Sequence, residues 1–140
     1  MLAVVDPNVL ISSRISDLGH PARIVRAADE GGFELVLSGR LLEEFYDVLM
    51  RPRFRRYATE EEVEDFLFGL REKGVFFEDV ETERMVPDDP KDDYLVALAH
   101  TSNADYLVSG EQHLAGVKGK VPVTVLTPRQ FTELLESESL

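Results

Sequence analysis

The sequence predicts an α/β fold built around a mainly parallel sheet. Short apolar runs typical of buried strands alternate along the chain with longer segments whose apolar residues recur at helical spacing. Strands that are joined by helices pair in parallel, because each connection crosses one face of the sheet. The 140 residues suffice for one domain with one core, and no repeat or linker divides them. We therefore expect residues 1–140 to form a single domain.

The strands are predicted from short apolar runs that end at turn or cap residues. The first, for example, stops at the turn signal Asp6-Pro7-Asn8. That run, Leu2–Val5, is typical of a buried strand. In order, the expected strands are Leu2–Val5, Phe33–Leu37, Val75–Val80, Tyr106–Ser109 and Val123–Leu126.

The helices are predicted from their caps. One helix is expected to follow His20-Pro21 and to stop at Gly31-Gly32. Ser38 is a suitable N-cap for a helix that runs to about Met50. The remaining helices are expected from the capping box Thr59-x-x-Glu62 to Gly74, from Asp89-Pro90 to about Asn103, and from Thr127-Pro128-x-Gln130 onward.

Composition narrows the classes of function. The sequence contains no cysteine, which excludes a disulfide framework, a thiolate zinc site and a cysteine nucleophile. Apolar runs such as Ala3–Val5 are far shorter than the roughly 20 residues of a membrane-spanning helix. No basic segment precedes an apolar stretch, so nothing indicates secretion. We expect a cytoplasmic protein that does not contact a membrane.

The net charge of −12 argues against a broad nucleic-acid-binding surface, but the charge is unevenly distributed. Residues 1–58 contain as many basic as acidic side chains, so the excess of acid lies in residues 59–140. The basic residues of the first part include Arg40 and a cluster that we name the arginine strip, namely Arg51, Arg53, Arg55 and Arg56. This strip either binds phosphates, docks an acidic partner or simply solvates a loop.

Acidic residues recur where the parallel strands are expected to end. Asp6 directly follows the first strand. Glu111 lies two residues after the expected strand Tyr106–Ser109, and Asp92 lies at the start of a helix. Parallel α/β sheets bind their ligands beyond the carboxyl ends of the strands. These three acids are therefore candidates for one shared site.

Helix geometry separates acids that face inward from their neighbours, because an α-helix turns by about 100° per residue. Glu44 lies on the margin of the apolar face of its helix, whereas Glu43 is expected in water. Asp92 is directed toward the expected core, and Asp93 away from it. Burial of an unpaired carboxylate costs several kcal/mol, so Asp92 requires a partner or a cation.

Carboxylates gathered at one edge would repel one another unless a divalent ion neutralised them. A set of oxygen ligands suits Mg²⁺ or Mn²⁺ rather than zinc. The alternative is that these acids are unrelated helix caps and surface side chains. The pattern alone leaves both interpretations open.

Four segments in order resemble the motifs of PIN-domain nucleases. Val4–Leu10 is similar to the opening motif, in which a strand ends in Asp-Thr-Asn-Val-Leu. Leu41–Phe54 and Pro87–Ala99 resemble the second and third motifs, and Ala104–Leu114 resembles the fourth, which normally reads Thr/Ser-Gly-Asp. Val125–Phe131 is similar to the last strand and helix of the family. The nearest branch is identified as the single-domain, VapC-like toxin components of bacterial and archaeal toxin–antitoxin pairs.

The resemblance implies a three-layer α/β/α sandwich with a sheet of about four to five strands. It also implies an endoribonuclease that cleaves single-stranded RNA with Mg²⁺ or Mn²⁺ as cofactor. In toxins it further implies inhibition by a cognate antitoxin protein and frequent formation of a homodimer. The matching positions are the central acids Asp6, Glu44 and Asp92, the fourth acid Glu111, the polar supports Asn8 and Ser109, and the auxiliary acid Asp93. Arg40 and the arginine strip are the expected contacts to RNA phosphates.

Two positions depart from the family pattern. Pro7 replaces a Thr or Ser, which removes a hydroxyl and a backbone N–H, and Glu111 replaces an Asp, which moves a carboxylate outward. Neither change removes an acid, so we expect the metal site to be retained. The departures also motivate an alternative, in which a PIN-like domain with weak or no catalysis binds RNA or a protein partner.

Overall fold

A computed structural model of the chain describes residues 1–80, 93–110 and 123–138. It contains a sheet of five strands in the order β3-β2-β1-β4-β5, and each neighbouring pair is parallel. The strands are β1 (Leu2–Val5), β2 (Glu34–Leu37), β3 (Val75–Phe76), β4 (Tyr106–Val108) and β5 (Thr124–Leu126). The predicted α/β fold with a parallel sheet is therefore confirmed.

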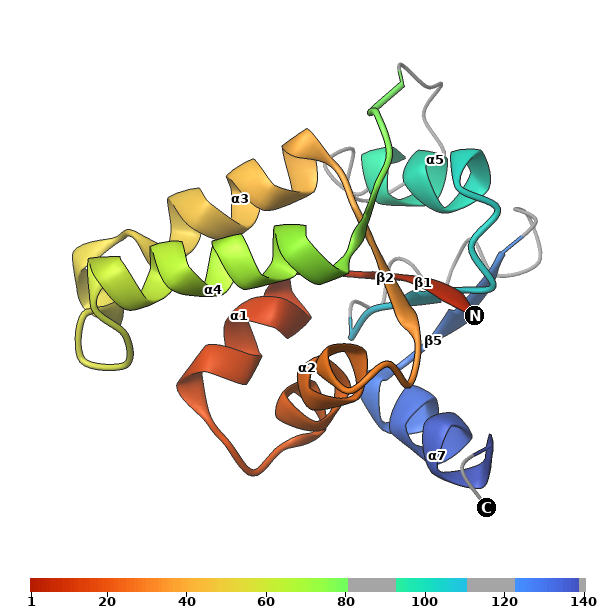
Figure 1. Ribbon diagram of the computed structural model, residues 1–140, viewed down its shortest axis with the longest axis horizontal. Coiled ribbons are helices and arrows are strands. Elements are labelled where there is room, and N and C mark those ends of the chain that lie inside the picture. The colour runs from red at the N-terminus through yellow and green to blue at the C-terminus, as the bar shows by residue number, and fades with distance from the viewer. Residues whose placement is uncertain (81–92, 111–122, 139–140) are drawn as a thin grey trace.

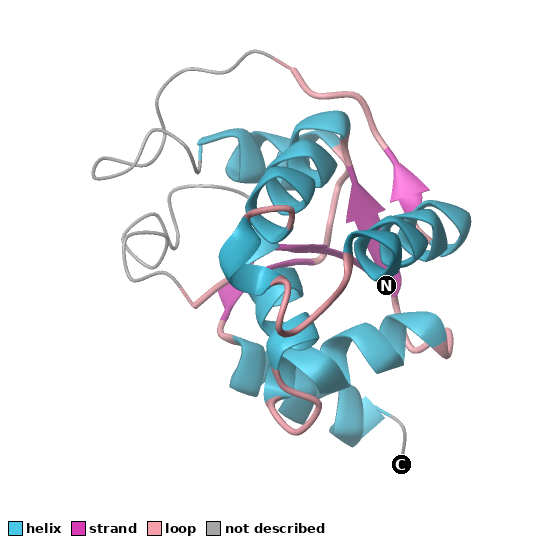
Figure 2. Ribbon diagram, turned by 90° about the vertical axis from the view of Figure 1, so that its left-hand side faces the viewer, coloured by secondary structure: helices cyan, strands magenta, loops and turns pink. Residues whose placement is uncertain are grey.

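Helices cover both faces of the sheet. They are α1 (Pro7–Ile15), α2 (His20–Asp29), α3 (Gly39–Leu49), α4 (Glu60–Lys73), α5 (Asp93–Thr101) and α7 (Pro128–Glu138), with the short 3₁₀ helix η1 (Pro52–Phe54) between α3 and α4. Figure 1 shows α5 on one side of the sheet and α1, α2 and α7 on the other. Helices α3 and α4 run antiparallel and project together from the sheet, and Figure 2 views the molecule from that side.

The order of the strands places a topological switch beside β1. The chain moves outward from β1 to β2 and β3 and then returns past β1 to β4 and β5. Right-handed crossovers in opposite directions lie on opposite faces of a sheet, which accounts for the separation of α5 from α1 and α2. The crevice between the carboxyl ends of β1 and β4 is consequently the position where such sheets bind ligands.

The register of the strands brings their carboxyl ends to one level. Val5 of β1 lies beside Val108 of β4, and Val108 lies beside Leu126 of β5. On the other side, Val4 pairs with Val36, one residue before β2 ends. The residues that follow the strands, among them Asp6, Ser38 and Ser109, therefore share one edge of the sheet.

The segment after β1 differs from the sequence prediction. Asp6-Pro7-Asn8 is the start of helix α1 and not only a turn. Pro7 is the first helical residue, where a proline is favoured because that N–H has no partner within the helix. The apolar residues Val9, Leu10 and Ile11 are adjacent in sequence and all buried, so they do not show the spacing of an amphipathic surface helix.

Strand β3 is shorter than the predicted strand Val75–Val80. It pairs with β2 only through Val75 and Phe76, and its last contact is the backbone bond from Phe77 N to Leu37 O, 2.8 Å long. Strand β2 ends at Leu37 because Ser38 caps α3, so the following residues have no strand to pair with. Val80 is accordingly 48% exposed. Of the predicted helix from Asp89 to about Asn103, Asp93–Thr101 is helical and residues 89–92 lie outside the described part.

Most predicted caps are found in the structure. The Ser38 hydroxyl accepts the N–H of Leu41 at 3.2 Å, and Thr59 and Glu62 form both bonds of a capping box. The core lies between the sheet and its helices, and it includes the fully buried Leu41, Phe45 and Phe131. Among the described residues, no helix combines the length and apolar character needed to cross a bilayer.

Two glycines on α4 and at its end provide a test of this packing. A Cβ at Gly74 would overlap the side chain of buried Leu37 and lie 2.9 Å from the carbonyl oxygen of Leu70, whereas a Cβ at Gly69 has no heavy atom within 4 Å. We expect Gly74→Ala to lower the free energy of unfolding by about 1–3 kcal/mol through overpacking. Gly69→Ala should raise it by about 0.5–1 kcal/mol, because alanine is the better residue within a helix.

Urea unfolding of both variants beside the unchanged protein measures these effects. The two substitutions add the same methyl group to the same part of the chain, so each serves as the control for the other. A neutral or stabilising effect of Gly74→Ala would contradict the tight approach of the α4–β3 junction to Leu37.

Candidate active site

The most buried part of the predicted site surrounds the carboxylate of Asp6. Asp6 follows β1, is the N-cap of α1 and is only 2% exposed. Its Oδ1 accepts the backbone N–H of Asn8 at 2.9 Å, and its Oδ2 accepts the hydroxyl of Ser109 at 2.8 Å. Its own N–H donates to the carbonyl of Val108 at 2.9 Å. The helix N-terminus and these donors stabilise a negative charge at the switch point of the sheet.

The second predicted acid, Glu44, is presented by α3. Its side chain is half-buried, and its Oε2 accepts a 2.6 Å hydrogen bond from the phenol of Tyr94 on α5. The adjacent Glu43 is exposed, as the helical angle predicts. The contact between Glu44 and Tyr94 therefore joins α3 to α5 near the carboxyl edge of the sheet.

Tyr94 is a buried residue that contacts both the carboxylate of Glu44 and the guanidinium of Arg40. Its side chain is 4% exposed, and the guanidinium carbon of Arg40 lies 4.5 Å from the centre of its ring. Burial raises the pKa of the phenol above its ordinary value of 10.0, and the hydrogen bond and charge of Glu44, followed by the charge of Asp6, raise it further. Arg40 acts on the pKa in the opposite direction. The phenol therefore remains a hydrogen-bond donor at physiological pH.

Two of the predicted acids lie in the described part of the chain, and both act on Tyr94, Glu44 by its hydrogen bond and Asp6 by its charge. The hydroxyl of Ser109 is bonded to Asp6. Oxygen ligands of this kind fit Mg²⁺ or Mn²⁺. Within residues 1–80, 93–110 and 123–138, no three acidic or histidine side chains form a group that could hold an ion. Asp92, Glu111 and the side chain of Asp93 lie outside the described residues.

The backbone of Asn8 contacts the Asp6 carboxylate. It is the second residue of α1 and is exposed, and its N–H is the donor to Asp6. Pro7, which lacks an N–H, does not deprive Asp6 of this bond, because the donor is the next residue. The departure from the family pattern at position 7 therefore leaves the Asp6 cap intact.

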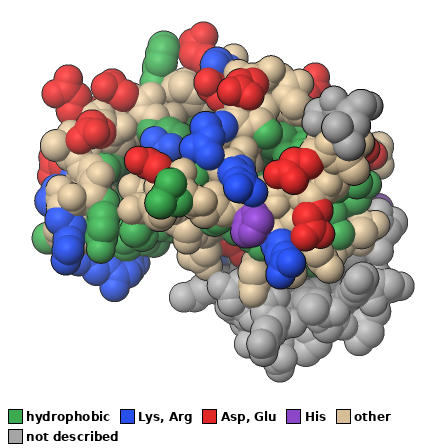
Figure 3. Space-filling model, turned by 90° about the horizontal axis from the view of Figure 1, so that it is seen from below, with side chains coloured by type: hydrophobic (Ala, Val, Ile, Leu, Met, Phe, Trp, Pro, Cys, Tyr) green, Lys and Arg blue, Asp and Glu red, His purple; other side chains and the backbone are tan. Residues whose placement is uncertain are grey.

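The arginine strip lies on and around η1, between α3 and α4. Arg51, Arg53 and Arg56 are exposed, and Figure 3 shows Lys and Arg side chains gathered at this end of the molecule. Arg55 differs, because its guanidinium bonds the carbonyl of Leu49 at the end of α3 and lies 4.0 Å from Glu60 Oε1. Arg55 thus stabilises the α3–α4 connection. The other three are exposed, and the guanidinium groups of Arg53 and Arg56 lie over the rings of Phe54 and Tyr57.

Arg40 is separate from the strip and lies at the first turn of α3. Its backbone N–H donates to Asp79 Oδ2 at 2.9 Å, and its side chain is exposed apart from the contact with the Tyr94 ring. Among the predicted phosphate contacts, Arg40 is therefore the one that touches the group around Glu44.

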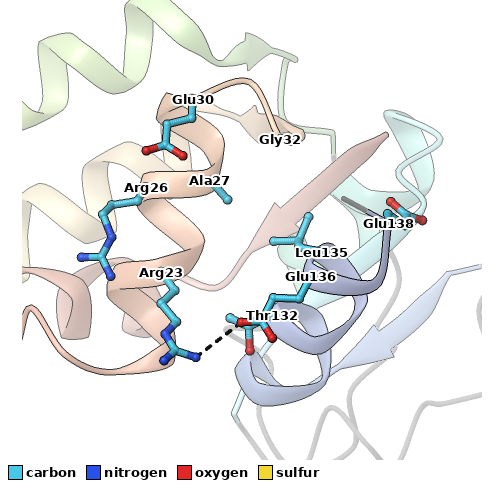
Figure 4. Close-up of a pocket in the computed structure, with 9 residues that line it drawn as sticks. All are labelled: Arg23, Arg26, Ala27, Glu30, Gly32, Thr132, Leu135, Glu136 and Glu138. Carbon is cyan, nitrogen blue, oxygen red and sulfur yellow. Dashed lines mark hydrogen bonds and ion pairs between the residues drawn. The ribbon is translucent and has the colours of Figure 1, made fainter. Parts of the chain in front are cut away.

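A separate groove of about 590 Å³ lies between α2 and α7. Its walls carry both charges, and an ion pair of 3.5 Å between Arg23 and Glu136 spans it (Figure 4). Deeper contacts include a 2.8 Å hydrogen bond between Thr132 and His20. None of the predicted site residues lines this groove, so it marks the packing of the two helices rather than the candidate active site.

Sequence reasoning does not identify Tyr94 as a site residue. Tyr94 lies in the buried run Tyr94–Ala99, where an aromatic residue is ordinarily part of the core. Its partner Glu44 is 50 residues away in the sequence, and no local spacing links the two. The contact arises from the packing of α5 near α3, which a single sequence does not specify.

Two comparisons relate the sequence and the fold of this chain to known proteins. A family model described as "PIN domain" matches residues 3–113. The fold is similar to a chain in the crystal structure of VapBC2 from Rickettsia felis bound to a DNA fragment from their promoter, with a TM-score of 0.59 and 10% sequence identity. That similarity covers 91% of this chain and 98% of the other. No curated protein matches the sequence significantly.

The environment of Tyr94 predicts an unusual alkaline titration. The unfolded chain should lose this proton near the ordinary pKa of 10.0, whereas the folded protein retains it to higher pH. The contribution of Tyr94 to stability is therefore complete below that pKa and declines as the pH rises above it. In ultraviolet difference absorbance of the folded protein, we expect Tyr94→Phe to leave the titration near pH 10 unchanged.

The control is Tyr57→Phe, because Tyr57 is 42% exposed. This substitution removes an exposed phenol instead of the buried one. Loss of the absorbance change near pH 10 in Tyr94→Phe would contradict the buried, hydrogen-bonded state of Tyr94.

Proposed function

The chain belongs to the PIN-domain family of nucleases, and on that premise we propose that it is a metal-dependent endoribonuclease that hydrolyses phosphodiester bonds in single-stranded RNA. The observation that carries the proposal is the buried Asp6 carboxylate at the switch point, held by the Asn8 N–H and the Ser109 hydroxyl. These donors fix the direction of the carboxylate beside the carboxyl ends of β1 and β4. An oriented, buried carboxylate at this position is a suitable ligand for a divalent cation.

The proposed cofactor is Mg²⁺ or Mn²⁺, and its ligands are Asp6 and Glu44 together with Asp92 and Glu111. Such an ion, when bound, lowers the pKa of the attacking water and neutralises charge on the phosphate. The chemistry of the donors supports the assignment, since every one is a carboxylate. Asp93 is the proposed auxiliary acid.

The residues around Asp6 fix the direction of its carboxylate. Each of its oxygens accepts a hydrogen bond from the protein, which restricts the rotation of the carboxylate. Ser109 comes from the end of β4 and Asn8 from α1, so the carboxylate is anchored to two elements. Glu44 supplies a second carboxylate, which binds the ion directly or through water, or accepts a proton from the attacking water.

Binding of the RNA backbone is assigned to Arg40 and the arginine strip. Arg51, Arg53 and Arg56 are exposed on one connection, which supports a role in contacting phosphates. Arg55 belongs to the same proposed surface, although its guanidinium is bonded to Leu49. Contacts of this type provide affinity and position the strand, but they select little sequence.

We further propose that this nuclease is the toxin of a toxin–antitoxin pair. The solved structure to which the fold is similar is described as VapBC2 bound to a promoter DNA fragment, and this likeness is the motivation. On this proposal the chain acts in the cytoplasm, is inhibited by a cognate antitoxin protein and forms a homodimer. The alternative is a catalytically weak domain that binds RNA or a protein partner, and metal-dependent cleavage distinguishes the two.

The central prediction concerns cleavage of end-labelled single-stranded RNA in the presence of Mg²⁺, Mn²⁺ or EDTA. We expect cleavage with either ion and none with EDTA. Asp6→Asn and Asp92→Asn should each reduce the rate by about 100-fold or more, because loss of one ligand charge weakens the site and misplaces the water. Circular dichroism confirms that each variant is folded.

The matched control is Glu43→Gln beside Glu44→Gln. The two residues are neighbours on α3, but Glu43 is exposed and Glu44 contacts Tyr94. Glu43→Gln should retain full activity and Glu44→Gln should lose it. Equal cleavage by all variants would indicate a contaminating ribonuclease or a wrong site, and no cleavage by the unchanged protein would favour the binding module.

A second prediction tests the arginine strip. Replacement of Arg51, Arg53 and Arg56 together by alanine should raise KM for RNA and leave kcat nearly unchanged. The logarithm of the association constant for RNA falls linearly with the logarithm of the salt concentration. In the triple variant, this slope should become shallower by about 0.7 for each phosphate of single-stranded RNA that is no longer neutralised. Kinetics over a series of salt concentrations measures both effects.

The control for the strip removes the same charge elsewhere. Arg23, Arg26 and Arg129 are residues of α2 and α7 outside the strip, and their joint replacement by alanine should leave KM and the salt dependence unchanged. If both triple variants weaken RNA binding equally, the effect is one of net charge and the strip is not a specific contact surface.

A further inference from the structure

We propose that Tyr94 is a positioning residue of the active site, which holds the carboxylate of Glu44 with its hydroxyl and the guanidinium of Arg40 with its ring. Through these two contacts, one side chain would set both the affinity for the metal ion and the affinity for RNA. This inference rests on the proposed nuclease function, and it deepens the description of the same site.

The first contact fixes a flexible acid. A glutamate on a helix surface has several rotatable bonds, and Glu44 is only half-buried. The 2.6 Å hydrogen bond from the Tyr94 phenol to Glu44 Oε2 is in the short range found for hydroxyl donors to carboxylates. Because this bond engages one oxygen of the carboxylate, it directs the other, Oε1, toward a fixed position where a ligand can be bound.

The second contact holds a cation beside that acid. The guanidinium carbon of Arg40 lies 4.5 Å from the centre of the Tyr94 ring, within the range of a cation–π interaction. The backbone of Arg40 is tied separately to Asp79 Oδ2. The side chain of Arg40 is otherwise exposed, so the ring of Tyr94 is what restricts its position.

Tyr94 is suited to this role because it is itself fixed. Its side chain is 4% exposed, and α5, on which it lies, packs against β1 and β4. Asp6 follows β1, and Ser109 follows β4. A rigid residue on α5 thus relates the longer side chains of α3 to the strand ends that carry the buried carboxylate. Outer partners of metal ligands act in this way when they orient a ligand without binding the ion.

The test separates the hydroxyl from the ring. Tyr94→Phe keeps the ring and removes the hydroxyl, so the dissociation constant for Mn²⁺, measured by calorimetry without RNA, should rise about tenfold or more. Cleavage at saturating Mn²⁺ should largely recover, and KM for RNA should not change. Tyr94→Leu removes the ring as well and should raise KM for RNA in addition.

The control is Tyr106→Phe. Tyr106 is a half-buried tyrosine at the opposite end of β4 from Ser109, and its ring centre lies 6.0 Å from that of Phe131. Removal of its phenol oxygen should change neither Mn²⁺ binding nor KM. Thermal unfolding of each variant establishes that the binding constants refer to folded protein.

A double-mutant cycle shows whether Tyr94 acts through Glu44. In a Glu44→Gln background, the effect of Tyr94→Phe on the Mn²⁺ dissociation constant should disappear. An undiminished effect in that background, or Mn²⁺ binding by Tyr94→Phe equal to that of the unchanged protein, would overturn the inference and leave the nuclease proposal standing. Absence of both Mn²⁺ binding and cleavage in the unchanged protein would instead overturn the proposed function, and the inference with it.

Discussion

The rest of the site depends on the burial of one carboxylate, that of Asp6. At 2% exposure, this group is sheltered from water at the point where β1 ends and α1 begins. Burial of an isolated charge is costly, and the protein compensates with the Asn8 N–H, the Ser109 hydroxyl and the N-terminus of α1. Each compensating group requires a particular element in place: α1 must begin immediately after β1, and β4 must lie beside β1 in the observed register. The environment of the Asp6 carboxylate therefore depends directly on the arrangement of β1, β4 and α1.

Much of the architecture follows from local signals that agree with one another. Ser38 and the Thr59–Glu62 pair cap their helices as their sequence spacing indicates, and the short apolar runs pair in parallel. The differences have physical causes. Helix α1 is not predicted from the sequence, for two reasons. Asp6-Pro7-Asn8 is a string typical of turns, and the buried positions of the helix lack amphipathic spacing. Strand β3 is shorter than the predicted strand Val75–Val80 because its length is set by where β2 ends, and the sequence of one strand does not identify its partner.

In the candidate site, too, some features are predictable from the sequence and others are not. Asp6 is predictable from its place after a strand, and the helical angle correctly separates half-buried Glu44 from exposed Glu43. Those are properties of a residue within its own element. The contacts of Tyr94 with Glu44 and Arg40 are properties of two elements packed together, and no periodicity in either segment contains them. The special place of Arg55, which bonds the carbonyl of Leu49, is likewise a result of how the α3–α4 connection turns back on the helix.

The position of Tyr94 bears on how carboxylates from separate layers can form one site. Asp6 follows the central strand β1 as the N-cap of α1, whereas Glu44 lies on α3, a helix that projects from the sheet. Helix α5 packs against β1 and β4, and its Tyr94 donates a hydrogen bond to Glu44. Helix α5 therefore links the position of Glu44 to that of the central strands. Since burial and the two carboxylates both raise the pKa of the phenol, the donor keeps its proton when negative charge accumulates at the site. A carboxylate or a lysine at this position would change the net charge of the proposed metal site. A neutral phenol orients Glu44 without changing that charge.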